Sequence, residues 1–426
     1  MFKVINQNKL LKVLSLNSFS VAISFVLGIL STKIISIFLG TSGMALIGSF
    51  RNFSVMIKSI ATMGISNSIV KLFVENKSDK KELSIIYSTF FWILLVVSII
   101  LTTIILLFSE AISELLFYSN VYKIPIQFFA FFLPLMVINT FWLAIYNALE
   151  QFKNIVIIQI ISNVLIFLVT ALLIWKKNIL GGLLSVAIGE LIMVLVTFLF
   201  VLKNTEYFKF DLQKVISTKY FEVIKKFIFM ALLSAIIAPL TLLLIRNSIV
   251  QNYSINEAGI WDAVNRFSSF YMLFFNTGLS LYYMPKLASL NTDEEYKTEL
   301  KSYFKTVFPL FIIMLVVILV SKSLIIKFVF SNEFSSINEL LIWQLAGDFI
   351  KIITLAFGFQ IVVKAMIKQY VVIELIFNLS YFILSYYLLK INAVEGVLEA
   401  YLYANAITLA AILVLFRKLF YLKKLL

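Results

Sequence analysis

The sequence lacks two of the side chains on which catalytic and metal sites most often depend. Its 426 residues contain no cysteine and no histidine, and only 14% of them are charged. The absence of cysteine excludes disulfides and thiol nucleophiles. The absence of histidine removes the commonest metal ligand and the usual titrating group near neutral pH. No GxxxxGK[ST] motif for nucleotide phosphates is present either. We therefore expect no catalytic residue, no metal and no cofactor.

Apolar residues supply most of what is present. They make up 62% of the chain, and its mean hydropathy is +1.01. Apolar runs of about 20 residues, the length that crosses a bilayer as a helix, recur from end to end. Backbone groups in hydrocarbon must bond internally, so the pattern predicts an all-α polytopic membrane protein. We attribute the net charge of +14 to loops and contacts with membrane lipids, and expect no nucleic-acid partner.

The apolar runs predict twelve membrane-spanning helices. Lysine and arginine concentrate in the loops on one side, which the positive-inside rule makes cytoplasmic, so both termini are expected in the cytoplasm. The N-terminal 20 residues read as a cytoplasmic start leading into the first span. The outward loops are too short for a folded domain. The predicted spans are 14–39, 44–73, 84–108, 124–149, 154–175, 179–203, 222–246, 258–288, 304–320, 338–363, 367–389 and 394–416.

Short segments repeat at an offset of roughly 212 to 217 residues. "SGMALIGSFRNFS" (42–54) matches "AGIWDAVNRFS" (258–268), and "ISELLFYSNVY" (112–122) matches "LIIKFVFSNEF" (324–334). Six spans fit in each unit, so the two copies have the same topology and form a parallel repeat. Transporters built from repeats bind their substrate where the repeats meet.

The repeat predicts two six-helix lobes joined by a linker. The linker is charged and contains no long apolar run. The predicted lobes are residues 1–203 and 222–426, and the linker is 204–221.

The second span carries two cations within an apolar helix. Arg51 and Lys58 are seven residues apart, Ser54 lies between them, and no acidic residue follows before Glu75. Seven residues return to nearly the same helix face, and a charge near mid-bilayer costs at least about 2.5–3.5 kcal/mol. We interpret Arg51 and Lys58 as unpaired cations that bind an anion in a polar cavity, and we expect Ser54 to line this cavity. Snorkelling, or pairing with an acid elsewhere, is the structural alternative.

The eighth span has a matching polar face. Arg266 is its cation, and we expect it to bind anions as well. Asp262 lies four residues earlier, so a local ion pair with Arg266 is the structural alternative. The polar residues expected to line a cavity with it are Asp262, Asn265, Ser269 and Asn276.

The first and seventh spans carry further candidates. Ser24 belongs to a polar face of the first span, and Lys33 lies in its outer third, where anion binding and snorkelling are both open. Pro239 removes a helix hydrogen bond and is expected to kink the seventh span.

Three acids inside the spans are candidates for coupling transport to an ion. Glu190 and Glu374 have no cation nearby on their own helices. Each is open to carrying a proton, since burial raises a carboxyl pKa, or to pairing across helices. Asp348 lies three residues before Lys351, which favours a local ion pair.

The opening of the chain resembles a known family. The similarity lies in "LGTSGMALIG" (39–48), "FRNF" (50–53) and "ATMGISNSIVKLF" (61–73). These pieces resemble Wzx-type O-antigen translocases and lipid III flippases of the multidrug/oligosaccharidyl-lipid/polysaccharide exporter superfamily. The resemblance implies two lobes that open alternately to either side, with spans one, two, seven and eight lining the cavity. It places Arg51 at a basic position of span two.

A basic cavity open to lipid suits an amphiphile with an anionic head. We expect a flippase that moves an undecaprenyl-diphosphate-linked oligosaccharide from the cytoplasmic to the periplasmic leaflet of the bacterial inner membrane, with a polysaccharide polymerase as a partner. Phosphate oxygens accept charge-assisted bonds from arginine and lysine. A cation-coupled multidrug exporter of the same superfamily, and a membrane enzyme of polysaccharide assembly, remain the alternatives.

Overall fold

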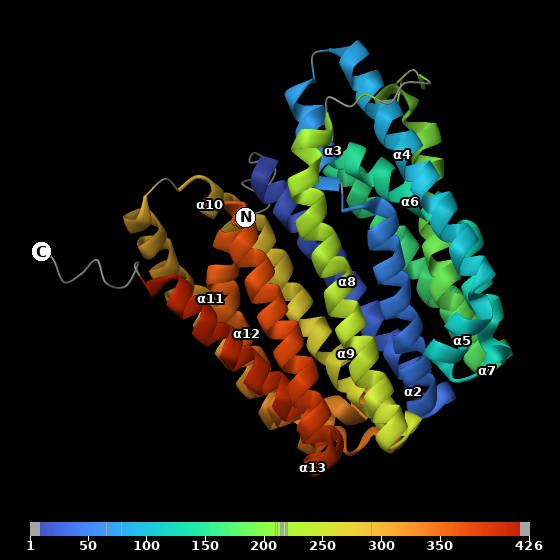
Figure 1. The fold of residues 1–426 in the computed structure, drawn as a ribbon, viewed down its shortest axis with the longest axis vertical. Helices are drawn as coiled ribbons and strands as arrows, with labels where there is room; N and C mark the ends of the chain where they lie inside the picture. The colour runs from blue at the N-terminus through green and yellow to red at the C-terminus, as the bar shows by residue number, and fades with distance from the viewer. Residues whose placement is uncertain are drawn as a thin grey trace, which may run out of the picture. The chain divides into compact units, whose positions relative to one another are not determined.

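The computed structural model describes residues 9–417, apart from 65, 78, 209, 211, 214–216, 218–219 and 291, and side chains from Phe19 onwards, apart also from 66–67, 207, 221–231 and 281. Within this part of the chain every regular element is helical (Figure 1), which confirms the predicted all-α membrane fold. The α-helices are α2 (Lys9–Thr62), α3 (Ser66–Glu75), α4 (Lys80–Leu107), α5 (Ser109–Phe117), α6 (Lys123–Ala148), α7 (Phe152–Lys203), α8 (Phe221–Asn252), α9 (Ile255–Gly278), α10 (Met284–Ala288), α11 (Asp293–Val329), α12 (Ile337–Val363) and α13 (Ile367–Leu415). Shorter helical turns are η1 (Asn120–Tyr122), η2 (Thr205–Phe208), the π-helix η4 (Leu279–Tyr283) and η5 (Asn332–Phe334).

Eight of the described helical segments are long and apolar enough to cross a membrane. Three of these helices, α2, α7 and α13, each contain non-helical backbone, at Gly40, at Asn178 and at Asn392 with Ala393. These interruptions fall in the short loops predicted between spans. The predicted eighth span corresponds to α9, which is more polar and is not among the eight. The total of twelve spans stays a prediction.

Residues with positive φ recur at one spacing. Asn178 and Ala393 have φ values of 48° and 51°, and Glu150 and Ala365 have values of 58° and 48°. The members of each pair are 215 residues apart, inside the offset at which the sequence repeats. Each pair occupies the same place in its half, because Glu150 and Ala365 precede α7 and α13, and Asn178 and Ala393 interrupt them. The backbone thus agrees with the repeat, which as a whole stays a prediction.

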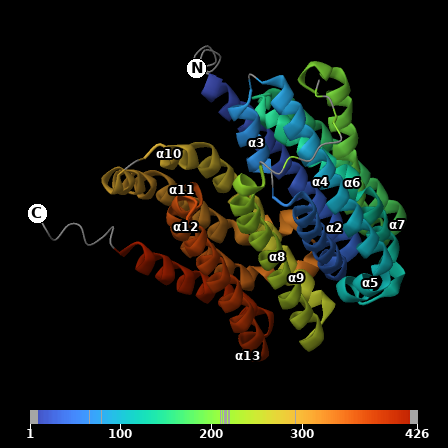
Figure 2. The same ribbon diagram turned by 45° about the horizontal axis from the view of Figure 1, so that its top comes forward.

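The chain divides into two compact units. In unit 1, α6 packs against α3, α4, α5 and α7. In unit 2, α12 packs against α9, α11 and α13, and Figures 1 and 2 both show α12 and α13 side by side. Helix α8 runs through Pro239, where unit 1 ends. The predicted lobes and linker stay a prediction. Unit 1 comprises Met1–Leu39 and Leu46–Pro239, and unit 2 comprises Gly40–Ala45 and Leu240–Leu426.

The segment that precedes α8 is attached to α4. The Trp92 indole donates to the carbonyl oxygen of Gln213 (2.9 Å), and the Gln213 N–H donates to the Ser88 hydroxyl (2.8 Å). The Tyr220 hydroxyl donates to Glu82. Burial, together with the Glu82 carboxylate, raises the pKa of Tyr220 above its usual value. The described part of the predicted linker is therefore held by specific hydrogen bonds to unit 1.

A close approach of two backbones places the segment Gly40–Ala45 on α9 within unit 2. A Cβ atom at Gly259 would lie 1.8 Å from the carbonyl oxygen of Thr41, so glycine is required at this contact. The Thr41 hydroxyl also donates to Asn256 Oδ1 (2.9 Å). Gly40 itself has φ 64° and ψ −161°, a region open almost only to glycine.

We expect Gly259→Ala to destabilise the protein by about 1–3 kcal/mol, the range for overpacked sites, because the segment Gly40–Ala45 must move away from α9. Thermal unfolding of the detergent-solubilised protein measures the effect. Gly358→Ala is the matched control, since a Cβ there meets no atom within 4 Å. Equal melting temperatures for the two variants would show that the contact is dispensable.

Candidate functional site

A charged pair joins α2 to α7 inside unit 1. The Lys58 ammonium nitrogen lies 2.6 Å from Glu190 Oε1, and the two side chains are 29% and 26% exposed. The interpretation of Lys58 as an unpaired cation is therefore wrong, because helix packing supplies an acid that is distant in the sequence. Both groups remain accessible from outside the protein core.

The other predicted residues of α2 differ in accessibility. Arg51 is half-buried and lies two helical turns before Lys58, so the two cations share a face of the helix. Ser54 is buried, and its hydroxyl donates to the carbonyl oxygen of Phe50 (2.7 Å), so its proton is used within α2 and it exposes little surface to a cavity. Lys33 is half-buried in the first part of the helix.

Polar residues of α7 that the sequence analysis did not single out face α2. Ser20 donates to Gln159 Oε1 (3.2 Å), and the Asn163 amide donates to the Ser24 hydroxyl (2.7 Å). Together with Lys58–Glu190, these bonds join the two helices at three levels. The sequence did contain a signal for these residues of α7, because Gln159 and Asn163 are polar residues four positions apart in an apolar span.

In unit 2, Asp262 is bound by Arg246 of α8. Arg246 Nε lies 2.7 Å from Oδ2 and Nη2 lies 2.5 Å from Oδ1, a bidentate arrangement. Arg246 is only 1% exposed, and its guanidinium carbon lies 5.5 Å from the ring centre of Trp261. The predicted seventh span, 222–246, ends at this arginine. Helix α8 continues to Asn252, so Arg246 lies within it.

The polar face of α9 is mostly bonded along its own helix. The Asn265 amide donates to the carbonyl oxygen of Trp261 (3.0 Å), and the exposed Ser269 donates to that of Asn265 (2.8 Å). The Arg266 guanidinium lies 5.8 Å from the Phe270 ring centre. The Arg266 guanidinium and the Asn276 amide both belong to half-buried residues.

Asp348 occupies a closed cluster of hydrogen-bond donors in unit 2. It is fully buried, and the predicted ion pair with Lys351 is wrong: the structure places Lys351 5.8 Å from the Tyr401 ring centre. Among the described residues, the Asp348 carboxylate is held by hydroxyl and amide groups, which occupy both of its oxygens. The donors are Ser268 (2.6 Å), Tyr271, Tyr401 (2.7 Å) and Gln344 (3.3 Å).

Glu374 differs from both other acids. It is half-buried on α13, and the Asn378 amide donates to its Oε1 atom (3.3 Å) as well as to its carbonyl oxygen (2.9 Å). The contact with Asn378 is local, whereas Glu190 is bound to a different helix.

These groups differ in what they can bind. A partly exposed ammonium exchanges one anion for another at little cost, whereas breaking a buried pair leaves an uncompensated charge. Lys58 can therefore exchange Glu190 for an incoming anion at less cost than Arg246 can exchange Asp262. Arg246–Asp262 is suited to a structural role. The described residues contain no cluster of three or more acids that could hold a metal ion.

Comparison with known proteins agrees with this architecture. The chain is 22% identical over 383 residues to the lipid III flippases of Escherichia coli (strain K12) and Shigella flexneri, which covers 88% of this chain and 90% of each flippase. Its fold matches an inward-facing multidrug resistance MATE family transporter of the MOP superfamily, with TM-score 0.76, 14% identity and coverage of 94% and 96% of the two chains. It also matches the lipid II flippase MurJ in an inward closed conformation, with TM-score 0.75, 18% identity and coverage of 94% and 87%.

The resemblance found in the sequence is thereby confirmed. The model of a family described as "Polysaccharide biosynthesis protein" matches residues 43–339, which is well over half of the sequence. The chain therefore belongs to this family of polysaccharide biosynthesis proteins.

Proposed function

We propose that the protein is a flippase for a polyprenyl-diphosphate-linked oligosaccharide, an O-antigen or related polysaccharide unit. The observation that carries the proposal is the Lys58–Glu190 pair. It gives an apolar helix of a polysaccharide biosynthesis protein a partly exposed cation, Lys58. Similarity to lipid III flippases over 88% of the chain supports a lipid-linked sugar as the cargo.

The diphosphate of such a lipid suits the cations of α2. Its oxygens replace the Glu190 carboxylate on Lys58, and Arg51 offers a second, planar donor set on the same helix face. Lys33 and, in unit 2, Arg266 are further anion ligands in this proposal. Ser24, Asn265, Ser269 and Asn276 supply polar groups for the sugars, while the polyprenyl tail remains in lipid.

The mechanism is alternating access, which carries the glycan from the cytoplasmic to the periplasmic leaflet of the inner membrane. Both termini are cytoplasmic in this proposal, and a periplasmic polysaccharide polymerase uses the product. The sequence has no nucleotide-binding motif, so an ion gradient or the membrane potential drives the cycle.

Glu190 is the best placed of the three candidate coupling acids. Its protonation removes the negative charge that holds Lys58 and leaves the ammonium to the substrate. Asp348 is fully buried among hydrogen-bond donors, and Glu374 is bonded to its own helix. The release of Lys58 is assigned in this proposal to Glu190, which contacts it directly.

Reconstitution tests the proposal. Proteoliposomes receive a fluorescent undecaprenyl-diphosphate oligosaccharide in one leaflet, and a membrane-impermeant quencher reports its appearance in the other. We expect translocation well above that of protein-free vesicles. Absence of translocation combined with drug sensitivity of a deletion strain would instead assign a multidrug exporter. Joining or release of sugars by the purified protein would assign an enzyme.

A further inference from the structure

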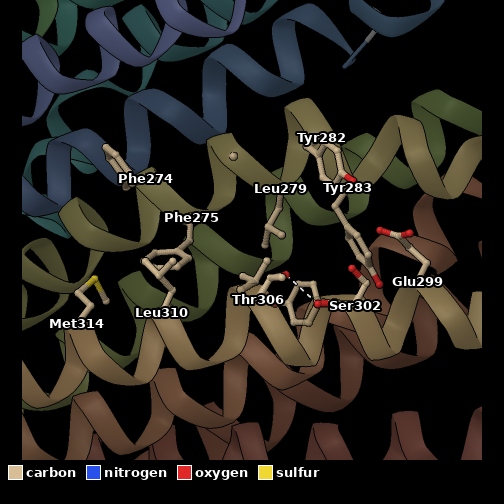
Figure 3. Close-up of a pocket in the computed structure, with 13 residues that line it drawn as sticks. Phe274, Phe275, Leu279, Tyr282, Tyr283, Glu299, Ser302, Thr306, Leu310 and Met314 are labelled. Carbon is tan, nitrogen blue, oxygen red and sulfur yellow. Dashed lines mark hydrogen bonds between the residues drawn. The ribbon is translucent and has the colours of Figure 1, made fainter. Parts of the chain in front are cut away.

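Unit 2 contains a groove that the proposed function does not use. It lies between α9, the π-helix η4 and α11 and has a volume of about 510 Å³, within the range of about 300–1,000 Å³ that is usual for ligand sites. Figure 3 shows that its two ends differ. Phe274, Leu310 and Met314 lie at one end, and Glu299 and Ser302 lie at the other.

Two backbone features form the groove. Gly278 lines it, and a Cβ atom at this position would meet no atom within 4 Å. The π-helix η4 begins at the next residue, and π-helical turns occur frequently at functional sites. The missing side chain and the change of helical register together leave the space beside α11 unfilled.

Two of the three tyrosines that line the groove contribute apolar walls. The Tyr283 hydroxyl donates to the carbonyl oxygen of Ala356 (2.9 Å), and the Tyr303 hydroxyl donates to that of Ile352 (2.8 Å). Both hydroxyls are thereby held by α12, and the tyrosine rings are left to line the space. Such walls suit an alkyl chain.

Glu299 gives one end of the groove a negative charge. Glu299 is the only charged residue among the described residues that line the groove. Within the described part of the chain, its carboxylate makes no hydrogen bond or ion pair. The nearby Ser302 adds a hydroxyl. An unpaired carboxylate favours a cationic group and repels a diphosphate.

The groove also has the length and direction of a membrane lipid. Glu299 and Met314 are separated along α11 by roughly 22 Å at a rise of 1.5 Å per residue. Helix α11 is a candidate membrane span that begins at Asp293. The acidic end thus lies near the start of the span and the apolar end lies deeper, as a phospholipid headgroup and its chain do.

We propose that this groove binds a zwitterionic aminophospholipid. One alkyl chain fills the apolar end, and the ammonium group lies at Glu299 and Ser302. The exposed Lys286 follows Tyr282 by four residues, about one helical turn, and supplies positive charge for the phosphate. The site is independent of the proposed transport function, because it shares no residue with the α2 cations.

Native mass spectrometry of the purified full-length protein tests the site with defined phosphatidylethanolamine or phosphatidylglycerol. We expect the wild type to retain one ethanolamine lipid about tenfold better than the glycerol lipid, the factor for one charge-assisted hydrogen bond. Glu299→Gln should remove this preference. Gly278→Leu should fill the groove and lose one bound lipid. Gly358→Leu is the matched control, because a Cβ there also meets no atom within 4 Å, and it should retain the lipid.

Three results would overturn the proposal. They are equal lipid retention by Gly278→Leu and Gly358→Leu, an unchanged preference in Glu299→Gln, and a preference of the wild type for phosphatidylglycerol. Retention of a polyprenyl phosphate in place of the ethanolamine lipid would also overturn it, and would assign the groove to the tail of a polyprenyl lipid. None of these readouts depends on transport activity.

Discussion

Exchanging the charges in Lys58→Glu/Glu190→Lys is expected to preserve the fold but not translocation. The exchanged pair can still join α2 to α7, yet the ammonium then stands on α7, away from the helix face that carries Arg51. Lys58→Ala should lower the translocation rate about 10- to 100-fold, since a hydrogen bond to a charged group contributes about 1.5–3 kcal/mol. The proteoliposome assay, normalised to protein incorporated, measures both effects.

Two controls separate binding from structure in this experiment. Lys71 makes an exposed pair with Glu75 at 3.8 Å, and Lys71→Ala should transport normally. Glu190→Gln removes the competing charge, so it should bind the lipid-linked substrate at least as well as the wild type while its transport loses dependence on the proton gradient. Normal transport by Lys58→Ala at normal abundance would contradict the anion-binding role.

Removing Arg246 is expected to cause the largest loss of stability. Arg246→Met leaves Asp262, whose side chain is 11% exposed, without the guanidinium that binds both of its oxygens. Breaking a buried ion pair in this way costs about 3–5 kcal/mol. Denaturant or thermal unfolding of the protein in detergent should show this loss, and the yield of folded protein should fall.

The double variant Arg246→Met/Asp262→Leu identifies the cause. It removes both charges, so most of the lost stability should return, and the double-mutant cycle yields the coupling energy of the pair. Lys123→Met is the comparison, because Lys123 and Glu110 form an exposed pair at 2.6 Å, for which about 0–1 kcal/mol is usual. An effect of Arg246→Met as small as that of Lys123→Met would mean that Asp262 needs no partner.

Arg246 was not predicted as a site residue, and the predicted partner of Asp348 was wrong. Arg246 was placed at a span boundary, yet α8 continues to Asn252, and helix ends are the least certain part of any sequence-based assignment. Asp348 was assigned to Lys351 because the two are neighbours on one helix, whereas its oxygens are taken by hydroxyls from α9 and α13. Local spacing identified unusual residues and misidentified their partners.

The amino-acid sequence by itself determined that this chain is an all-helical membrane protein and that Arg51 and Lys58 stand out on α2. Transfer of side chains into hydrocarbon depends on residue type and run length, which are local properties. Only the tertiary structure decided that Lys58 binds Glu190, 132 residues away, and that a glycine and a π-helix leave a groove beside α11. Both depend on which helices pack together and in what rotation, and the apolar surface of a membrane helix carries little pattern that specifies its neighbours.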